Sequence, residues 1–250
     1  MTGRLIASIN TQNMSDTAVR FFTACRTGDL ETVKKMCENA KVEDIDIILR
    51  GYEIALQRSD DLVRYMLLDS PHRSFLRTEL NTRVGDVCEE GDLERAQYYA
   101  SLMQLCDQVY EPSMNTYILC CERGHLDIIR WLHSTTRCGD DKWKGGSRLG
   151  LRAAACVDVL PVVQWLLANV AFEQDTIDTV FRYAASNGSS RVVSFLLQHG
   201  VSEEAILVAY DAPVREDEDS EDDSYTVTLS VKDAIALYMA GKKSKKASLH

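Results

Sequence analysis

Apolar and polar positions follow one pattern several times along the chain: two apolar residues, a polar residue, an aromatic or long residue, and two further apolar residues. The clearest copies are Leu62–Leu67, Val162–Leu167 and Val192–Leu197, and a fourth, residues 128–133, ends in a histidine. Weaker copies occupy residues 32–37 and 95–100. Apolar residues spaced in this way lie on one face of a helix. The pattern therefore predicts a series of similar amphipathic helices.

These copies recur at a nearly constant period. The second residue of each copy lies at position 33, 63, 96, 129, 163 or 193, so successive copies are 30, 33, 33, 34 and 30 residues apart. A period of this length is typical of stacked repeats, in which each unit buries its apolar face against its neighbours.

A second, earlier helix is predicted in each unit, because a pair of small or apolar residues precedes each copy and a turn follows the pair. Gly is expected at such a turn, since a helix commonly ends in a residue with positive φ, which Gly adopts without steric strain. The turns are Gly28-Asp29, Gly91-Asp92, Gly124-His125 and Gly188-Ser189. The pairs are Ala24-Cys25, Ile54-Ala55, Val87-Cys88, Cys120-Cys121, Ala154-Ala155 and Ala184-Ala185.

The helix, tight turn and second helix resemble the ankyrin repeat, most clearly in CCERGHLDIIRWLH and AASNGSSRVVSFLLQHG. The resemblance covers about residues 17–200. It implies an all-α, ankyrin-like solenoid of about six to seven helix-turn-helix repeats. Tetratricopeptide repeats have a similar period but carry their aromatic residues in the first helix, whereas this chain carries them in the second.

The chain also departs from the ankyrin pattern. The usual Thr-Pro-Leu-His opening is absent, with residues 115–118 in its place, and we expect irregular loops between repeats. Arg58-Ser59 replaces Gly-His in the second repeat, and the fifth has Asp158 to Pro161, where Pro161 is tolerated in a first helical turn.

We expect four segments along the chain. An N-terminal extension, residues 1–16, precedes the six repeats of residues 17–200, and a degenerate capping repeat follows at 201–241, where Ser202 and Ser230 are expected to cap helices. The cap is interrupted by the acidic insertion 215–224, which has seven carboxylates and one Arg and favours a solvated segment over a docking site for a basic partner. A basic tail, 242–250, ends the chain.

Composition narrows the function classes. The formal net charge of −10 argues against nucleic-acid binding, which needs a basic surface. Apolar runs such as Val162–Val170 fall short of the roughly 20 residues that a membrane span needs, and the N-terminus lacks a signal-peptide core. We therefore expect a monomeric cytoplasmic protein that binds neither membrane nor nucleic acid. The Lys-rich tail, 242–246, offers nuclear import as the alternative.

The cysteines are expected to be reduced packing residues. Four of them, Cys25, Cys88, Cys120 and Cys121, fall in the small pairs, where a free thiol behaves as a small apolar side chain. Zinc would need a set such as Cys120, Cys121, His125, His133 and Cys138, whose spacing matches no standard finger. No metal and no cofactor are expected.

Catalytic motifs are also missing from the sequence. There is no Gly-x-Ser-x-Gly elbow, no phosphate-binding P-loop and no Gly-x-Gly-x-x-Gly fingerprint. Residues 144–147 could hold an anion ahead of a helix, but a loop followed by an N-cap explains them equally well. The aromatic stripe is read as a packed outer face rather than a base-stacking ladder. It comprises Tyr65, Tyr98, Trp131, Trp165 and Phe195.

The resemblance implies a protein-binding surface formed by the concave face and the loop tips of the stack. By position, the loops are residues 69–79, 101–113 and 134–146. Exposed aromatic residues and arginines supply much of the binding energy at interfaces, although the aromatic residues could instead cover their own repeats. The candidate partner-binding residues are Arg73, Phe75, Arg77, Tyr110, Lys142, Trp143 and Lys144.

The expected function is that of a non-enzymatic adaptor or scaffold that binds another protein. The alternative is a regulatory or inhibitory subunit that masks an enzyme or a transcription factor. A fragment of a pathogen or viral effector and an enzyme with an undetected active site are two further hypotheses.

Overall fold

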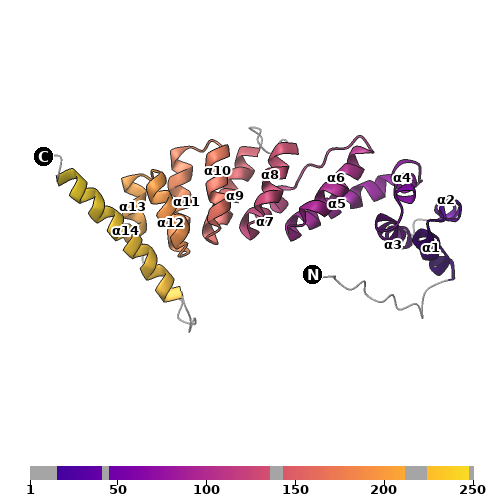
Figure 1. Ribbon diagram of the computed structural model, residues 1–250, viewed down its shortest axis with the longest axis horizontal. Helices are drawn as coiled ribbons and strands as arrows, with labels where there is room; N and C mark the ends of the chain where they lie inside the picture. The colour runs from indigo at the N-terminus through magenta and orange to yellow at the C-terminus, as the bar shows by residue number, and fades with distance from the viewer. Residues whose placement is uncertain (1–15, 41–44, 136–142, 212–223, 248–250) are drawn as a thin grey trace. The chain divides into compact units, whose positions relative to one another are not determined.

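The structure is a computed structural model that describes residues 16–40, 45–135, 143–211 and 224–247. These residues form helices joined by turns, and no strand occurs among them (Figure 1). The all-helical part of the fold prediction is therefore confirmed. Most of the predicted extension 1–16 and of the acidic insertion 215–224 lies outside the described residues.

Fourteen helices are present within the described ranges, mostly of 9 to 13 residues. The first eight are α1 Asp16–Thr27, α2 Leu30–Asn39, α3 Ile45–Leu56, α4 Asp60–Leu68, α5 Arg73–Glu90, α6 Leu93–Gln104, α7 Met114–Arg123 and α8 Leu126–Thr135. The remaining six are α9 Lys144–Cys156, α10 Leu160–Asn169, α11 Gln174–Ser186, α12 Ser190–His199, α13 Glu203–Asp211 and α14 Ser224–Ala247.

The chain divides into two compact units. The first comprises Met1–Arg83 and Tyr98–Val109, and the second comprises Val84–Gln97 and Tyr110–His250. In the first unit, α1 contacts α2 and α3, and α4 contacts α2 and α3. In the second unit the odd-numbered helices α7, α9, α11 and α13 pack on one another in chain order, and α10, α12 and α14 do the same. We call the odd-numbered helices first helices and the even-numbered ones second helices.

The turn between the two helices of a repeat has the same geometry in five places. In each, the backbone N–H that follows the turn residue donates to the carbonyl five residues earlier, the closure of a Schellman motif. The five donors are Asp29, Asp92, His125, Val159 and Ser189, at 2.9 to 3.0 Å. The residue before each donor has positive φ. Gly supplies it four times, as predicted, and Asp158 supplies it once, at φ 57.

Neighbouring turns in the second unit also pack on one another. His125 Nε2 lies 3.1 Å from the carbonyl oxygen of Glu89 and must carry the proton, because a carbonyl only accepts. Ser189 Oγ donates to the carbonyl of Cys156 at 3.1 Å in the same way. A Cβ on Gly91 would lie 2.5 Å from the His125 ring. Gly91 is therefore required both for its φ of 81 and for this close approach.

The two irregular turns have separate explanations. At the second repeat Arg58 has no positive φ, and the Ser59 N–H bonds to Ala55 instead. At the fifth, Asp158 adopts the left-handed conformation that short polar side chains tolerate, and its carboxylate accepts from the backbone N–H of Val192 at 2.9 Å. Pro161 lies in the first turn of α10, as predicted.

The core consists of the small pairs and the repeated apolar residues. Cys25, Cys88, Cys120 and Cys121 are buried, which confirms their packing role. The aromatic stripe is packed or half-packed, as predicted: Tyr65 is buried and the other four residues are half-buried.

The C-terminal repeat corrects part of the prediction. Ser202 caps α13 as expected, since its Oγ accepts from the Ala205 N–H at 3.2 Å. Ser230 was predicted to cap the last helix, and this is wrong, because α14 already begins at Ser224. Buried Val231 lies one turn before buried Ile235, so the apolar face starts further back than expected. Residues 242–247 of the predicted tail belong to α14.

Candidate binding surface

The predicted loop at 69–79 is wrong from Arg73 onward, because α5 begins there. The missed signal is Ser70 followed by Pro71: the Ser70 Oγ accepts from the His72 N–H at 3.1 Å, and a proline is favoured at a helix start. Arg73 and Phe75 are exposed on the first turn of α5. Arg77 is half-buried, and its Nε donates to the carbonyl of Leu67 at 2.9 Å, which holds the start of α5 against the end of α4.

Two of the predicted loop regions meet within the first unit. A groove is lined by Arg77, Thr78 and Asn81 of α5 and by Gln108 and Val109 after α6. The loop predicted at 101–113 starts later than expected, because α6 continues to Gln104. Of these groove residues, Val109 is the most exposed large apolar one, at 65%.

Tyr110 is a core residue. Only 4% of its surface is exposed, its ring stacks on Trp131 with centroids 6.4 Å apart, and burial raises the pKa of its hydroxyl. The alternative stated for the loop aromatics, that they cover their own repeat, therefore applies to Tyr110. It cannot contact a partner in this conformation.

Trp143 is half-buried and also packs inward. Its ring meets the Tyr117 ring edge-on at 5.8 Å, and a Cβ on Gly146 would lie 2.8 Å from Trp143 Cε3. Lys144 is the first residue of α9, so the predicted loop 134–146 ends earlier than expected. Lys142 and the side chain of Lys144 lie outside the described residues.

Three of the residues considered as zinc ligands have another role. Cys120 donates to the carbonyl of Cys88 at 3.2 Å, His125 contacts Glu89, and His133 Nε2 lies 2.8 Å from the Tyr117 hydroxyl. Cys138 lies outside the described residues. Across the described ranges, no three His, Cys, Asp or Glu side chains gather as the ligands of a metal ion would.

The exposed faces of α9 and α11 carry a group of residues that the sequence analysis did not select. Arg152 of α9 lies over the ring of Tyr183 of α11, with its guanidinium carbon 5.1 Å from the ring centroid. Tyr183 is nevertheless 42% exposed. Arg148, one turn before Arg152, and Arg182 are exposed too. We call Arg148, Arg152, Arg182 and Tyr183 the first-helix surface.

Two charges at this surface act on the pKa of a neighbouring thiol, Cys156. Burial raises the pKa of Cys156, Arg152 opposes the rise, and Glu122 of α7 adds to it. The edge of the surface therefore contains Glu122 of α7 and Cys156 at the end of α9. The sequence signal was available: Arg148 and Arg152 are four residues apart, which places them on one helix face.

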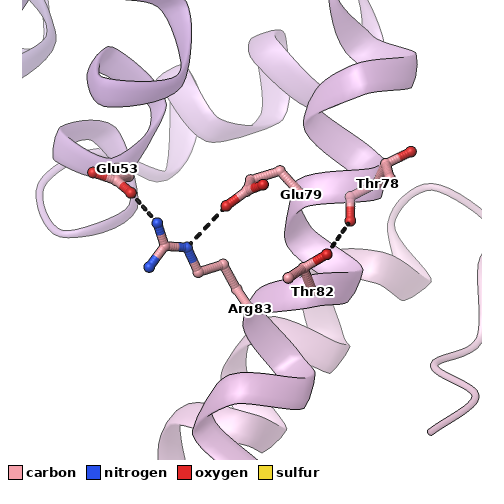
Figure 2. A network of polar contacts seen from close by, with 5 residues as sticks. All are labelled: Glu53, Thr78, Glu79, Thr82 and Arg83. Carbon is pink, nitrogen blue, oxygen red and sulfur yellow. Dashed lines mark hydrogen bonds and ion pairs between the residues drawn. The ribbon is translucent and has the colours of Figure 1, made fainter. Parts of the chain in front are cut away.

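Some of the other described arginines are paired with carboxylates. Figure 2 shows Arg83 of α5 between Glu79 of the same helix and Glu53 of α3, with its Nε 3.2 Å from Glu79. Arg191 similarly pairs with Asp158 at 2.9 Å. Arg148, Arg152 and Arg182 have no such carboxylate partner among the described residues.

No family model, curated protein or solved structure matches the chain. Within the described residues, no helix is long and apolar enough to cross a membrane.

Proposed function

We propose that the chain is a non-enzymatic adaptor or scaffold, built as a divergent ankyrin-like stack, that binds another protein. The first helices of its repeats provide the contact surface. The observation that carries this proposal is the exposed pair of Arg152 and Tyr183 on neighbouring first helices. Arginine and tyrosine are among the residues most often responsible for binding energy at protein interfaces.

The repeated packing explains why such a surface is available. In the second unit, α9 and α11 are each covered by their own second helix and by the first helices before and after them, as α11 is by α12, α9 and α13. The remaining side of α9 and of α11 faces solvent, and the two helices place these sides next to each other. Of the predicted contact residues, Arg73 and Phe75 of α5 are exposed and stay in the proposal.

The test is affinity capture with mass spectrometry, using the wild-type chain and an Arg152→Ala, Tyr183→Ala variant. An Arg130→Ala, Gln164→Ala variant is the matched control, because both residues are exposed on second helices. Arg130 makes only a surface ion pair with Asp127 at 3.8 Å, which contributes little stability. Circular dichroism must show that both variants stay folded.

We expect at least one protein to be captured by the wild type and the control variant but not by the Arg152→Ala, Tyr183→Ala variant. Equal capture by all three proteins, or equal loss from both variants, would refute the assignment of the surface. The effect of the captured protein's binding on its own activity then separates an adaptor from a regulatory or inhibitory subunit.

A further inference from the structure

The first-helix surface is positively charged, in contrast to the chain as a whole. Helix α9 carries Arg148 and Arg152 and no Asp or Glu in its 13 residues. Helix α11 adds Arg182, together with Asp175 and Asp178. The chain has a formal net charge of −10. Three arginines on two neighbouring helices are therefore a local departure from an acidic molecule.

The guanidinium groups of this surface have few protein acceptors. Across the described residues, no carboxylate lies within ion-pair distance of Arg148, Arg152 or Arg182. Each guanidinium has five N–H donors in a planar fork that fits a carboxylate. Arg182 uses one of these donors in a hydrogen bond to the Thr179 hydroxyl, at 3.1 Å.

Two nearby carboxylates do not change this. Asp178 lies one turn before Arg182, and its oxygen already accepts from the Ser202 N–H at 3.0 Å and from Gln174 Nε2 at 2.9 Å. Glu122 lies on α7 at the edge of the surface, where it raises the pKa of Cys156 while Arg152 lowers it. The three arginines keep N–H donors available to an incoming ligand.

Tyr183 orients one of these arginines. A guanidinium stacked on an aromatic ring keeps its N–H edges free for hydrogen bonds in the plane, and the ring limits its rotation. Because the guanidinium carbon of Arg152 lies over the Tyr183 ring, the ring limits the positions that the guanidinium can take before a ligand binds. The exposed part of the ring adds an apolar contact beside it.

The spacing of the arginines defines the shape of the ligand. Four residues along a helix correspond to about 6 Å, which separates Arg148 from Arg152. Alternate side chains of an extended peptide are about 6.6 to 7 Å apart and point to one side. Packed helices lie about 8 to 10 Å apart, so Arg182 can contact a third carboxylate further along the same segment.

We propose that α9 and α11 bind an extended acidic segment of the partner protein. Carboxylates at alternate positions of that segment contact Arg148 and Arg152, and a further carboxylate contacts Arg182. This inference rests on the proposed function and specifies the chemistry of its partner. Nucleic acid fits less well, since a phosphate backbone would be repelled by the net charge of the chain and is bound mainly through Lys and Arg contacts to its phosphates.

The test is fluorescence anisotropy with the purified full chain and a labelled nine-residue peptide that carries Glu at alternate positions with Leu and Ala between them. We expect saturable binding below about 1 mM at low salt. Arg148→Gln and Arg152→Gln should each weaken it about three- to tenfold. Arg130→Gln on α8 is the matched control and should leave it unchanged, and the same peptide with Gln for Glu should not bind.

Several results would overturn the acidic-segment inference: no saturation by the peptide, equal weakening by Arg130→Gln, or tighter binding of an oligouridylate RNA of similar length than of the peptide. If the peptide fails while capture still depends on Arg152 and Tyr183, the binding surface stands and only the partner chemistry is wrong. If both fail, the surface itself is wrong.

Discussion

Two helix-interior glycines in the second unit should respond differently to replacement by Ala. Gly150 of α9 faces α7, where an added Cβ would lie 2.8 Å from Cys121 Sγ and 2.9 Å from Tyr117 Cε1. Cys121 and Tyr117 are fully buried and have little room to move. Gly85 of α5 is also buried, but its added Cβ would meet its nearest neighbours at 3.5 Å, an ordinary contact distance.

The expected free energies follow from two opposing effects. Replacing Gly by Ala inside a helix stabilises the folded chain by about 1 kcal/mol, because Gly loses more backbone freedom on folding. Overpacking a filled core costs about 1 to 3 kcal/mol. Gly85→Ala should therefore raise the free energy of unfolding by about 0.5 to 1 kcal/mol. Gly150→Ala should be neutral at best and destabilise by up to about 2 kcal/mol.

Urea unfolding followed by circular dichroism measures both changes, and each kcal/mol should move Tm by about 2 to 4 °C for a chain of this size. The two variants share the same chemistry, so helix propensity cancels between them and the difference reports the packing of α9 on α7. If Gly150→Ala were as stable as Gly85→Ala, the first helices would not stack as described.

Three further predictions concern single side chains. Burial lowers the pKa of His133 in the folded chain, so as the pH falls His133 is protonated in the unfolded chain before it is protonated in the folded chain. The free energy of unfolding should therefore fall as the pH drops below about 6.5, and His133→Gln should remove the part of this fall that His133 causes. Burial raises the pKa of Cys120 to about 12, so iodoacetamide at about pH 7.5 should modify half-buried Cys156 first and Cys120 only after unfolding in urea. Asp158→Ala should destabilise by about 1 kcal/mol or more, because Ala lacks the acceptor for Val192 and tolerates positive φ poorly, whereas Asp158→Asn should cost less.

Each of these has a clear contrary result. If urea titrations at about pH 7.5 and 5.5 show the same change in unfolding free energy for the wild type and His133→Gln, His133 does not cause the loss of stability. Peptide mapping that finds Cys120 labelled as fast as Cys156 would contradict its burial. Equal unfolding free energies for Asp158→Ala and the wild type would show that this turn does not need its aspartate.

The repeated helix pairs could be predicted because their signals are local. A glycine such as Gly124 marks a turn through its own φ, and an apolar pair such as Ile128-Ile129 marks a helix face through its spacing. Asp158 in the left-handed conformation could not be assigned in this way, since Asp also occupies ordinary helix-capping positions.

Side-chain surroundings were harder to predict because they depend on neighbouring repeats. Tyr110 lies in a loop sequence, yet its position is decided by stacking on Trp131, some 21 residues away. The pairing of Arg152 with Tyr183 likewise depends on how α9 and α11 are aligned. The sequence of α9 indicated this surface only through the four-residue spacing of Arg148 and Arg152, which places them on one helix face.

Hydrogen–deuterium exchange of the chain with and without a captured partner tests the central claim most directly, because it locates the contact without substitutions. We expect exchange to slow on binding in the first helices, most strongly in Lys144–Cys156 and Gln174–Ser186. The second helices Leu126–Thr135 and Leu160–Asn169 should exchange as before. Slower exchange confined to those second helices would place the partner on the opposite layer and contradict the account.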